Sequence, residues 1–496
     1  ASYWWPFEDL YITLRYGQNL ADGLGLRFNP GETVDGYTSF AWVVVAAVAS
    51  WAGPVDTLLQ LLGAAAGLAL LVWLFRHLTM TRGISTAVAA TTTAVLAASG
   101  TWAFWSATGM ETSSFALAIF AAVVLAENPG RPWPWIVLGL ATLIRPEAVG
   151  YSLAIAAAVA VRDWRAAARG LAITLAIFAP YFIWHWLHFG HPLPNTFYAK
   201  ASPSGSTLWR GMVALELFLS SQMAWPMVAV AAWATYRRFG STWVRLHAAV
   251  AAAAFANIVI VGGDVFNFHR FAFPALAPLL VLFATGVVDL SERLRRYSAR
   301  PALVGAGSIA VLALWTAAAT VTPPLAILSD QPVSHRQRAS ESADLYRDFF
   351  EIGDWLADNV PEDTVLATNA AGIVPYRSGL PTIDMLGLND MHIAHRELPL
   401  GVRVIGHEKY DADYVLSRQP DLIIIGLPEL TPTMPASPEQ VRRLVQKRTA
   451  SLPGDLDLIG DPRFPRLYTP ITVKVGSHGW LTMFARRARL SELRPR

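Results

Sequence analysis

Two adjacent carboxylates, Glu8 and Asp9, stand at the start of a segment that the sequence predicts to be an interfacial helix. One carboxylate can accept a proton from a sugar hydroxyl while the other orients the substrate. The pair also has a simpler interpretation, because acidic residues stabilise the first turn of any helix. Glu8 and Asp9 are therefore the candidate catalytic pair, and their residue types leave open which of the two is the base.

Other polar residues recur in short clusters between apolar runs, and arginine or histidine side chains among them could hold a phosphate leaving group. The candidates for donor or phosphate binding are Arg15, Tyr198, Lys200, Asp264, His269 and Arg270. The candidates for a cavity or an acceptor site are Tyr37, Glu111, Arg145, Glu147, Asn195, Asp384, Asn389, Asp390 and His392. Carboxylates near membrane level are costly and usually face a cavity.

Each cluster has a structural alternative. Arg145 and Glu147 could form an ion pair at a helix break, which we favour over contact with a substrate. His269, Arg270, Lys200 and Tyr198 have the residue types of membrane-interface anchors. Glu111 and Asp264 could begin helices, and residues 384–392 could be a turn-rich loop.

The composition indicates a membrane protein. Of the 496 residues, 54% are hydrophobic and 15% are charged, whereas globular domains carry about 25% charged residues. A soluble protein of this length would need a more highly charged surface, so we expect lipid to cover much of this one.

Apolar runs of about 20 residues are candidates for membrane helices. They lie at 57–76, 84–104, 113–127, 170–188, 210–235, 245–261, 271–290 and 302–322, and the stretch 134–161 could form two helices that meet at Arg145-Pro146-Glu147. The run 38–53 is too short to span comfortably. Arginine is concentrated in alternate loops, which the positive-inside rule assigns to the cytoplasm. We therefore expect about ten spans, with residues 1–37 and the C-terminal region outside, and a further membrane helix before Ala1.

The C-terminal region has the pattern of a soluble α/β domain. An amphipathic helix is predicted at 342–359, and buried strands at 365–367 and 422–425, with a last strand at 470–475. The predicted fold class is thus a mainly α, polytopic helical bundle followed by an extracytoplasmic α/β domain. We place the membrane module at 1–325, with an acidic external loop at 1–37, the soluble domain at 326–485 and a basic, solvated tail at 486–496.

Several function classes are excluded or disfavoured. The chain has no cysteine and a net charge of +3, so thiolate chemistry is impossible, and the basic residues form no stripe for nucleic acid. His335, His392, His395 and His407 lack the spacing of metal ligands, so we expect no required metal.

The order of these motifs resembles that of GT-C fold glycosyltransferases. The resemblance rests on residues 8–39, Gly109-Met110-Glu111-Thr112, Leu143-Ile144-Arg145-Pro146-Glu147, Pro192–Tyr198, Gly262-Gly263-Asp264, 367–372 and 384–390. It is greatest to the branch that contains mycobacterial terminal arabinofuranosyltransferases. The usual Asp-Asp-Ala-Tyr of the first external loop reads Glu8-Asp9-Leu10-Tyr11 here.

The resemblance implies a multi-pass enzyme of the bacterial inner membrane that uses a polyprenyl-phosphate sugar. Its partners would be the bilayer, this donor and a cell-envelope glycan or glycolipid acceptor, and Asp9 would be the catalytic carboxylate. The alternatives are a transporter or flippase for a lipid-linked sugar and a non-catalytic, glycan-binding membrane scaffold. A transporter favours polar sites at the bilayer midplane and internal repeats, and the sequence shows neither.

Overall fold

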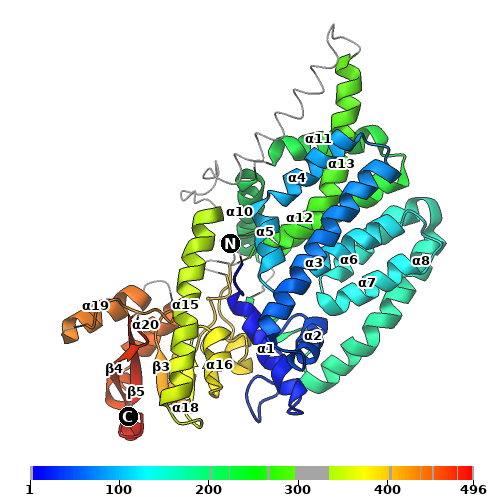
Figure 1. Ribbon diagram of the computed structural model, residues 1–496. Coiled ribbons are helices and arrows are strands. Elements are labelled where there is room, and N and C mark those ends of the chain that lie inside the picture. The colour runs from blue at the N-terminus through cyan, green and yellow to red at the C-terminus, as the bar shows by residue number, and fades with distance from the viewer. Residues whose placement is uncertain are drawn as a thin grey trace. The chain divides into compact units, whose positions relative to one another are not determined.

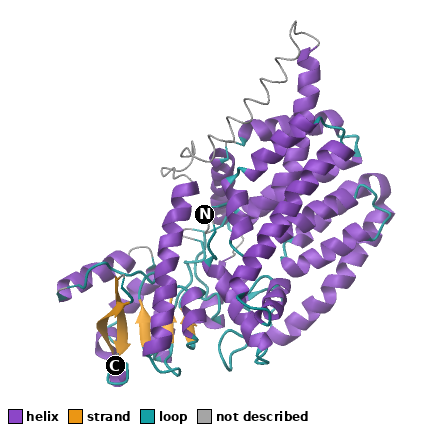
Figure 2. Ribbon diagram, viewed as in Figure 1, coloured by secondary structure: helices purple, strands orange, loops and turns teal. Residues whose placement is uncertain are grey.

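The chain is mainly helical, with strands confined to its C-terminal region among the residues described (Figure 2). The structure is a computed structural model that describes residues 4–200, 204–222, 224–264, 268–295, 335–401, 405–435, 437–449, 452–477 and 479–493. It divides into two compact units. The first contains 1–6, 57–184 and 205–340, and the second contains 7–56, 185–204 and 341–496.

The first unit is a bundle of apolar helices (Figure 1). Its elements are α3 (Val55–Arg76), the π-helix η1 (His77–Thr81), α4 (Thr86–Ala97), α5 (Gly100–Ala107), α6 (Thr112–Leu125), α7 (Trp133–Ile144), α8 (Ala148–Phe189), α10 (Gly205–Ser221), α11 (Trp225–Arg238), α12 (Thr242–Val261), η2 (Arg270–Ala272) and α13 (Phe273–Arg295). The first residues of α3 and the last of α8 belong to the second unit.

Four helical segments of the described chain are long and apolar enough to cross a membrane, or six if each of two bent helix pairs forms one span. The bent pairs α4–α5 and α10–α11 occupy the runs predicted at 84–104 and 210–235. The predicted break at 145–147 is confirmed, because α7 ends at Ile144 and α8 begins at Ala148. The segment α2 (Phe40–Ser50) is short, as expected, and the predicted span 302–322 lies outside the described residues.

Close helix packing forms the core of this unit. Trp135, Leu138 and Ile155 are among the fully buried side chains where α6, α7, α8, α12 and α13 meet. A Cβ on Gly170 would lie 1.9 Å from the Trp135 ring, so only glycine allows this contact. Small residues at such positions let membrane helices approach closely.

The second unit contains a five-stranded sheet in the order β2-β1-β3-β5-β4. Strands β1 (Leu366–Thr368), β2 (Thr382–Asp384) and β3 (Leu422–Ile424) are parallel, whereas β4 (Tyr468–Val475) and β5 (Gly479–Arg486) are antiparallel. Its helices are α1 (Glu8–Ala21), α2, α9 (Asn195–Lys200), α15 (His335–Asn359), α16 (Ile373–Ser378), α17 (Met391–Ala394), α18 (Ala412–Arg418), α19 (Pro438–Thr449), α20 (Pro453–Gly460) and α21 (Phe464–Leu467), and a short turn η3 (Arg487–Arg489) follows β5.

The predicted helix at 342–359 and the strands at 365–367 and 422–425 correspond to α15, β1 and β3. The prediction that the last strand ends at 475 is wrong, because β5 follows and pairs with β3. The prediction of a solvated tail from 486 also fails for two of its arginines. Arg486 and Arg489 both form ion pairs with the buried Asp421.

Residues 7–56 and 185–204 pack with the C-terminal region rather than with the helical bundle. Ile12, Tyr16, Phe28, Phe189 and Ala371 share one buried cluster in this second unit. The sequence had assigned the first four to the membrane module at 1–325. The segment that includes α1 and residues 22–37 therefore contributes to the core of the same unit as the sheet.

Candidate functional site

The adjacent carboxylates occupy the first turn of α1. Phe7 precedes the helix without a capping side chain, and Glu8 and Asp9 are the acidic residues of this turn. Both side chains are partly exposed, whereas Leu10 to Tyr16 of the same helix are buried. The buried face of α1 thus fixes the helix and leaves the two acids at its exposed beginning.

Glu8 is held from the sheet region. The backbone N–H of Gly372 donates to Glu8 Oε1 at 2.6 Å. A Cβ on Gly372 would lie 2.1 Å from the Glu8 carbonyl oxygen, so this close approach requires glycine. Burial, followed by the charge of Asp9, raises the pKa of Glu8 to about 8. Glu8 is therefore protonated at neutral pH.

A histidine and a tyrosine lie near the acidic pair, and a lysine lies near that histidine. His407 lies near both Lys200 and Asp9, which shift its pKa in opposite directions, while burial lowers that pKa overall. The Lys200 chain runs along Gly406, where a Cβ would lie 3.2 Å from Lys200 Cε. The carboxylates of Glu8 and Asp9 raise the pKa of Tyr346, after the larger effect of its burial.

This arrangement brings together two carboxyl groups and an imidazole, and an ammonium group lies near that imidazole. Two interacting carboxyls titrate as a pair, and the first proton stays with the group that is harder to ionise. Asp9, partly exposed beside Glu8, is in position to accept a proton. The chemical capacity is that of a base, with one ammonium group in the same region that can neutralise an anion.

Arg15 has a different position from the one its phosphate assignment requires. It is buried, and it donates to the carbonyl oxygens of Phe28 at 2.8 Å, Pro375 at 2.5 Å and Leu380 at 2.9 Å. These bonds join α1 to the segment 375–380. The geometry therefore makes Arg15 a positioning residue, and its phosphate role stays a prediction.

The predicted acceptor residues of 384–390 stabilise their own loop. Asp384 is buried and accepts hydrogen bonds from the backbone N–H of Leu386 at 3.0 Å and of Asn389 at 2.8 Å. Asp390 accepts from Ile393 N at 3.0 Å and so caps α17. Burial raises the pKa of Asp384 to about 6. This is the turn-rich loop that the sequence left as an alternative.

Asn195, at the start of α9, attaches to this loop. Its Nδ2 donates to the carbonyl oxygens of Gly387 at 2.9 Å and Leu388 at 3.0 Å. Its backbone N–H donates to Asp35 Oδ1 at 3.2 Å, and the other Asp35 oxygen lies 2.6 Å from His185 Nε2. The segments around 35, 195 and 387 are thereby held together.

The remaining predicted residues of the second unit differ in exposure. Tyr37 is buried against Tyr16, with ring centroids 4.9 Å apart. Tyr198 stacks on His395 at 4.2 Å. His392 is half exposed and lies 2.9 Å from Asp411. His392 is thus the member of the predicted acceptor set with the most accessible ring.

The first unit contains its own ionic cluster. Arg145 forms ion pairs with Glu111 and Glu147, as the sequence favoured for Arg145 and Glu147. Its guanidinium lies 5.4 Å from the Phe271 ring centroid. The Arg145 and Glu111 side chains are almost completely buried. The cluster fixes the break between α7 and α8, and its contact with a substrate stays a prediction.

Asp264 and His269 line a pocket of about 70 Å³ in the first unit, with Phe218 and Phe271 among its apolar walls. Arg270 donates to both oxygens of Asp264, at 3.0 and 3.3 Å. His269 Nε2 lies 3.0 Å from Ser221 Oγ. Their phosphate assignment stays a prediction, and a phosphate would have to compete with Asp264 for Arg270.

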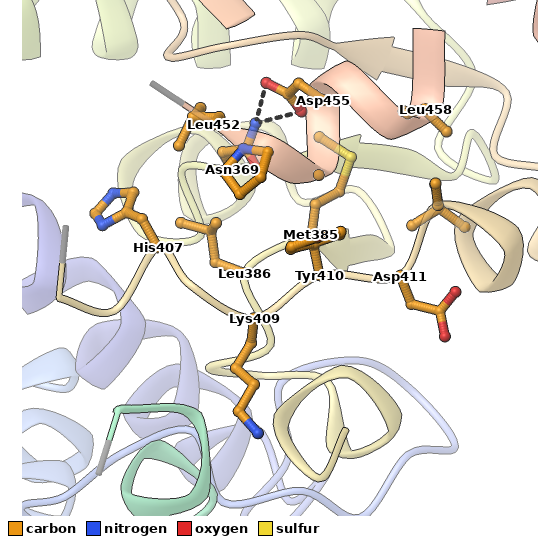
Figure 3. Close-up of a pocket in the computed structure, with 14 residues that line it drawn as sticks. Asn369, Met385, Leu386, His407, Lys409, Tyr410, Asp411, Leu452, Asp455 and Leu458 are labelled. Carbon is orange, nitrogen blue, oxygen red and sulfur yellow. Dashed lines mark hydrogen bonds between the residues drawn. The ribbon is translucent and has the colours of Figure 1, made fainter. Parts of the chain in front are cut away.

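A small pocket lies where the parallel strands of the second unit end (Figure 3). Asn369 follows β1 and donates to both Asp455 oxygens at 3.0 Å, and Gly426 N after β3 donates to Asp455 Oδ2 at 2.7 Å. Ligands of open α/β sheets bind at this edge. The volume of this pocket, about 10 Å³, accommodates one water molecule rather than a sugar.

Sequence reasoning missed Gly372, Tyr346 and His407 as neighbours of the acidic pair. They are more than 300 positions away from Glu8 in the chain, and no spacing rule connects them. His407 was considered only as a metal ligand. The signal that could have identified Gly372 is its place directly after a buried strand, at the edge where a parallel sheet binds partners.

Comparison of the sequence with known proteins identifies a family only for the C-terminal region. Residues 335–480 match a family model described as a domain of unknown function, DUF8728. No match to the sequence was found among curated proteins.

The structure is similar to that of ArnT from Cupriavidus metallidurans in the apo state. The TM-score is 0.57 at 13% identity, over 97% of this chain and 93% of ArnT. For ArnT bound to undecaprenyl phosphate the TM-score is 0.54 at 13% identity, over 97% and 94%. ArnT has the GT-C fold, so the predicted fold class is confirmed.

Proposed function

We propose that this protein is an integral membrane glycosyltransferase that takes its sugar from a polyprenyl-phosphate donor. The observation that carries the proposal is the acidic pair at the start of α1, with Gly372 fixing Glu8, with His407 near Asp9 and with Lys200 near His407. The similarity to ArnT over nearly the whole of both chains, including the form that binds undecaprenyl phosphate, supports the class of donor.

The proposed step is a displacement at the anomeric carbon of the donor. The acceptor hydroxyl gives its proton to Asp9, and its oxygen forms the new bond to that carbon. The bond between this carbon and the phosphate oxygen breaks, and the electron pair leaves with polyprenyl phosphate. Lys200 supplies positive charge to the departing phosphate.

Glu8 keeps its proton during this step. Its neutral form adds no second negative charge beside the Asp9 carboxylate that receives the proton. The resemblance to arabinofuranosyltransferases supports arabinofuranose as the sugar and a cell-envelope glycan or glycolipid as the acceptor. We place the donor reaction at the external face, with the sheet region periplasmic.

The test uses purified protein in detergent with radiolabelled polyprenyl-phosphate arabinose, mannose, glucose or galactose and a cell-wall glycan extract. We expect label to enter the glycan from one donor. Asp9→Asn should lower this transfer by about 100-fold or more, because proton transfer to a base contributes about that factor. The matched control is Asp22→Asn, which changes an exposed aspartate just after the same helix.

Retained transfer in Asp9→Asn would refute the role of Asp9 as the base. Equal losses in Asp9→Asn and Asp22→Asn would point to a folding defect, which the melting temperatures of both variants would reveal. No transfer from any donor by protein that still moves lipid-linked sugar between the leaflets of a vesicle would favour the flippase interpretation.

A further inference from the structure

Three buried or partly buried side chains of the first unit converge at one end of the bundle, separate from the acidic pair. They are His77, which begins the π-helix η1, Glu127 just after α6, and His247 in α12. One ring nitrogen of each histidine and one carboxylate oxygen of Glu127 lie within 4.8 Å of one another. No sequence pattern points to this group, because its members are far apart in the chain.

The two histidines are almost completely buried, and their rings stack with centroids 5.6 Å apart. The tautomer of His247 follows from its surroundings. Its Nδ1 lies 2.8 Å from the Trp243 carbonyl oxygen, which can only accept, so Nδ1 carries the proton. Its Nε2 then presents a lone pair, as in metal-binding histidines whose other nitrogen donates to a carbonyl.

Polar atoms in this group lack partners among the described residues. His77 Nδ1, His247 Nε2 and Glu127 Oε1 are all buried without a hydrogen bond. Buried polar atoms are nearly always paired, so the unpaired Glu127 Oε1 and His247 Nε2, which belong to one group, require an explanation. The π-helix is a second, independent indication, because such turns occur frequently at functional sites.

Arg82 is the cation that now lies beside the group. It forms an ion pair with Glu127 Oε2, its Nε lies 3.2 Å from His77 Nε2, and it packs over the Trp243 ring at 4.2 Å. These contacts use the other carboxylate oxygen and leave Glu127 Oε1 and His247 Nε2 without a hydrogen bond. A guanidinium therefore satisfies only part of the cluster.

We propose that His77, Glu127 and His247 bind a divalent transition metal ion of the zinc class. Two imidazoles and one carboxylate are a donor set that zinc prefers, with water completing four ligands. Ligand atoms around tetrahedral zinc lie about 3.4 Å apart, and His77 Nε2 is already 3.7 Å from Glu127 Oε1. Binding there displaces the Arg82 Nε contact, while Arg82 keeps Glu127 Oε2.

The ion would link the ends of three helices, at η1, α6 and α12. Arg76, Arg82 and Arg245 lie close in sequence to the ligands, so the charge bias assigns this end to the cytoplasm. The site is thus independent of the proposed transfer reaction.

The test is a Zn²⁺ titration of wild-type protein that has been purified with a histidine-free tag and stripped with a chelator. We expect one equivalent to bind and raise the melting temperature, and Co²⁺ to give the visible absorption of a tetrahedral site. His77→Gln and His247→Gln should each weaken binding by about 100-fold or more. His188→Gln is the matched control, because His188 is exposed on α8.

Arg82→Gln separates the metal from the existing ion pair. Removing the guanidinium removes a like charge, so this variant should bind Zn²⁺ more tightly than wild type, and Zn²⁺ should restore its melting temperature. Wild-type protein that binds no Zn²⁺ beyond the level of His77→Gln would overturn the proposal. Folded Arg82→Gln that binds less Zn²⁺ than wild type would also overturn it.

Discussion

The protonated state of Glu8 can be tested by replacing this residue with glutamine. Glu8→Gln keeps an oxygen that accepts the Gly372 N–H and an NH₂ group that donates to Asp9, but it cannot ionise. The variant therefore resembles the form of Glu8 that the structure predicts at neutral pH. It differs from wild type only where Glu8 would lose its proton.

The direction of the stability change with pH follows from the raised pKa of Glu8, which is about 8 in the folded chain against an ordinary value of 4.5. Between these values the folded protein holds a proton that the unfolded chain has released. The free energy of unfolding of wild type therefore falls as pH rises through this window. Below about pH 4.5 the difference disappears, because both states are protonated.

The stability difference between Glu8→Gln and wild type has an upper limit. One pKa unit is worth about 1.4 kcal/mol, so the interval from 4.5 to about 8 corresponds to at most about 5 kcal/mol. Glu8 is partly exposed, and solvent screening reduces this value. We expect Glu8→Gln to be more stable than wild type by about 2 kcal/mol at pH 8 and by little at pH 4.5.

Melting temperatures in detergent, measured from pH 4.5 to pH 8.5, provide the assay. About 2 kcal/mol corresponds to roughly 5 °C for a unit of this size. The control is Glu439→Gln, whose carboxylate is 70% exposed on α19. A difference between Glu8→Gln and wild type that does not change with pH, or that shrinks toward pH 8, would refute the reasoning. This test does not depend on the proposed enzymatic activity.

Two further substitutions test the contacts that residues 7–37 make with the C-terminal part of the second unit. Gly36→Ala should destabilise the protein by about 1–3 kcal/mol, because its Cβ would lie 1.8 Å from Asn389 Oδ1. The control is Gly130→Ala, whose Cβ meets open space and should have little effect. Equal melting temperatures of the two variants would contradict the contact. Arg15→Lys should lower the free energy of unfolding by about 2–4 kcal/mol, because one ammonium cannot replace the guanidinium bonds to three separate carbonyl groups. The control is Arg131→Lys, at an exposed position. A fall in transfer without a fall in melting temperature would instead favour a phosphate role for Arg15.

The fold could be predicted largely from the sequence because its strongest signals are local. An apolar run long enough to span a membrane predicts a helix, and a proline between an arginine and a glutamate predicts the end of one, without reference to the rest of the chain. The break at Arg145 is such a case. Strand β5 was missed because its polar and aromatic residues lack a clear alternation, and its burial depends on pairing with β3 and β4.

The candidate site was predictable only in part, and the reason is the same in both units. Asp9 and Glu8 are recognisable because they are adjacent, whereas Gly372 and His407 join them only through the topology of the second unit. His77, Glu127 and His247 likewise meet only when three helices of the first unit pack together.

The structure also changes the interpretation of individual polar residues that the sequence grouped together. Arg15, Asn195 and Asp384 form hydrogen bonds with backbone groups, and these bonds hold the surrounding segments in place. Asp9 is partly exposed beside Glu8, and we propose it as the group that takes the proton. Residue type alone cannot separate these roles, because a buried polar side chain must be paired whether or not it serves catalysis. The number of backbone partners, rather than the presence of charge, is therefore what distinguishes the framework of this site from its chemistry.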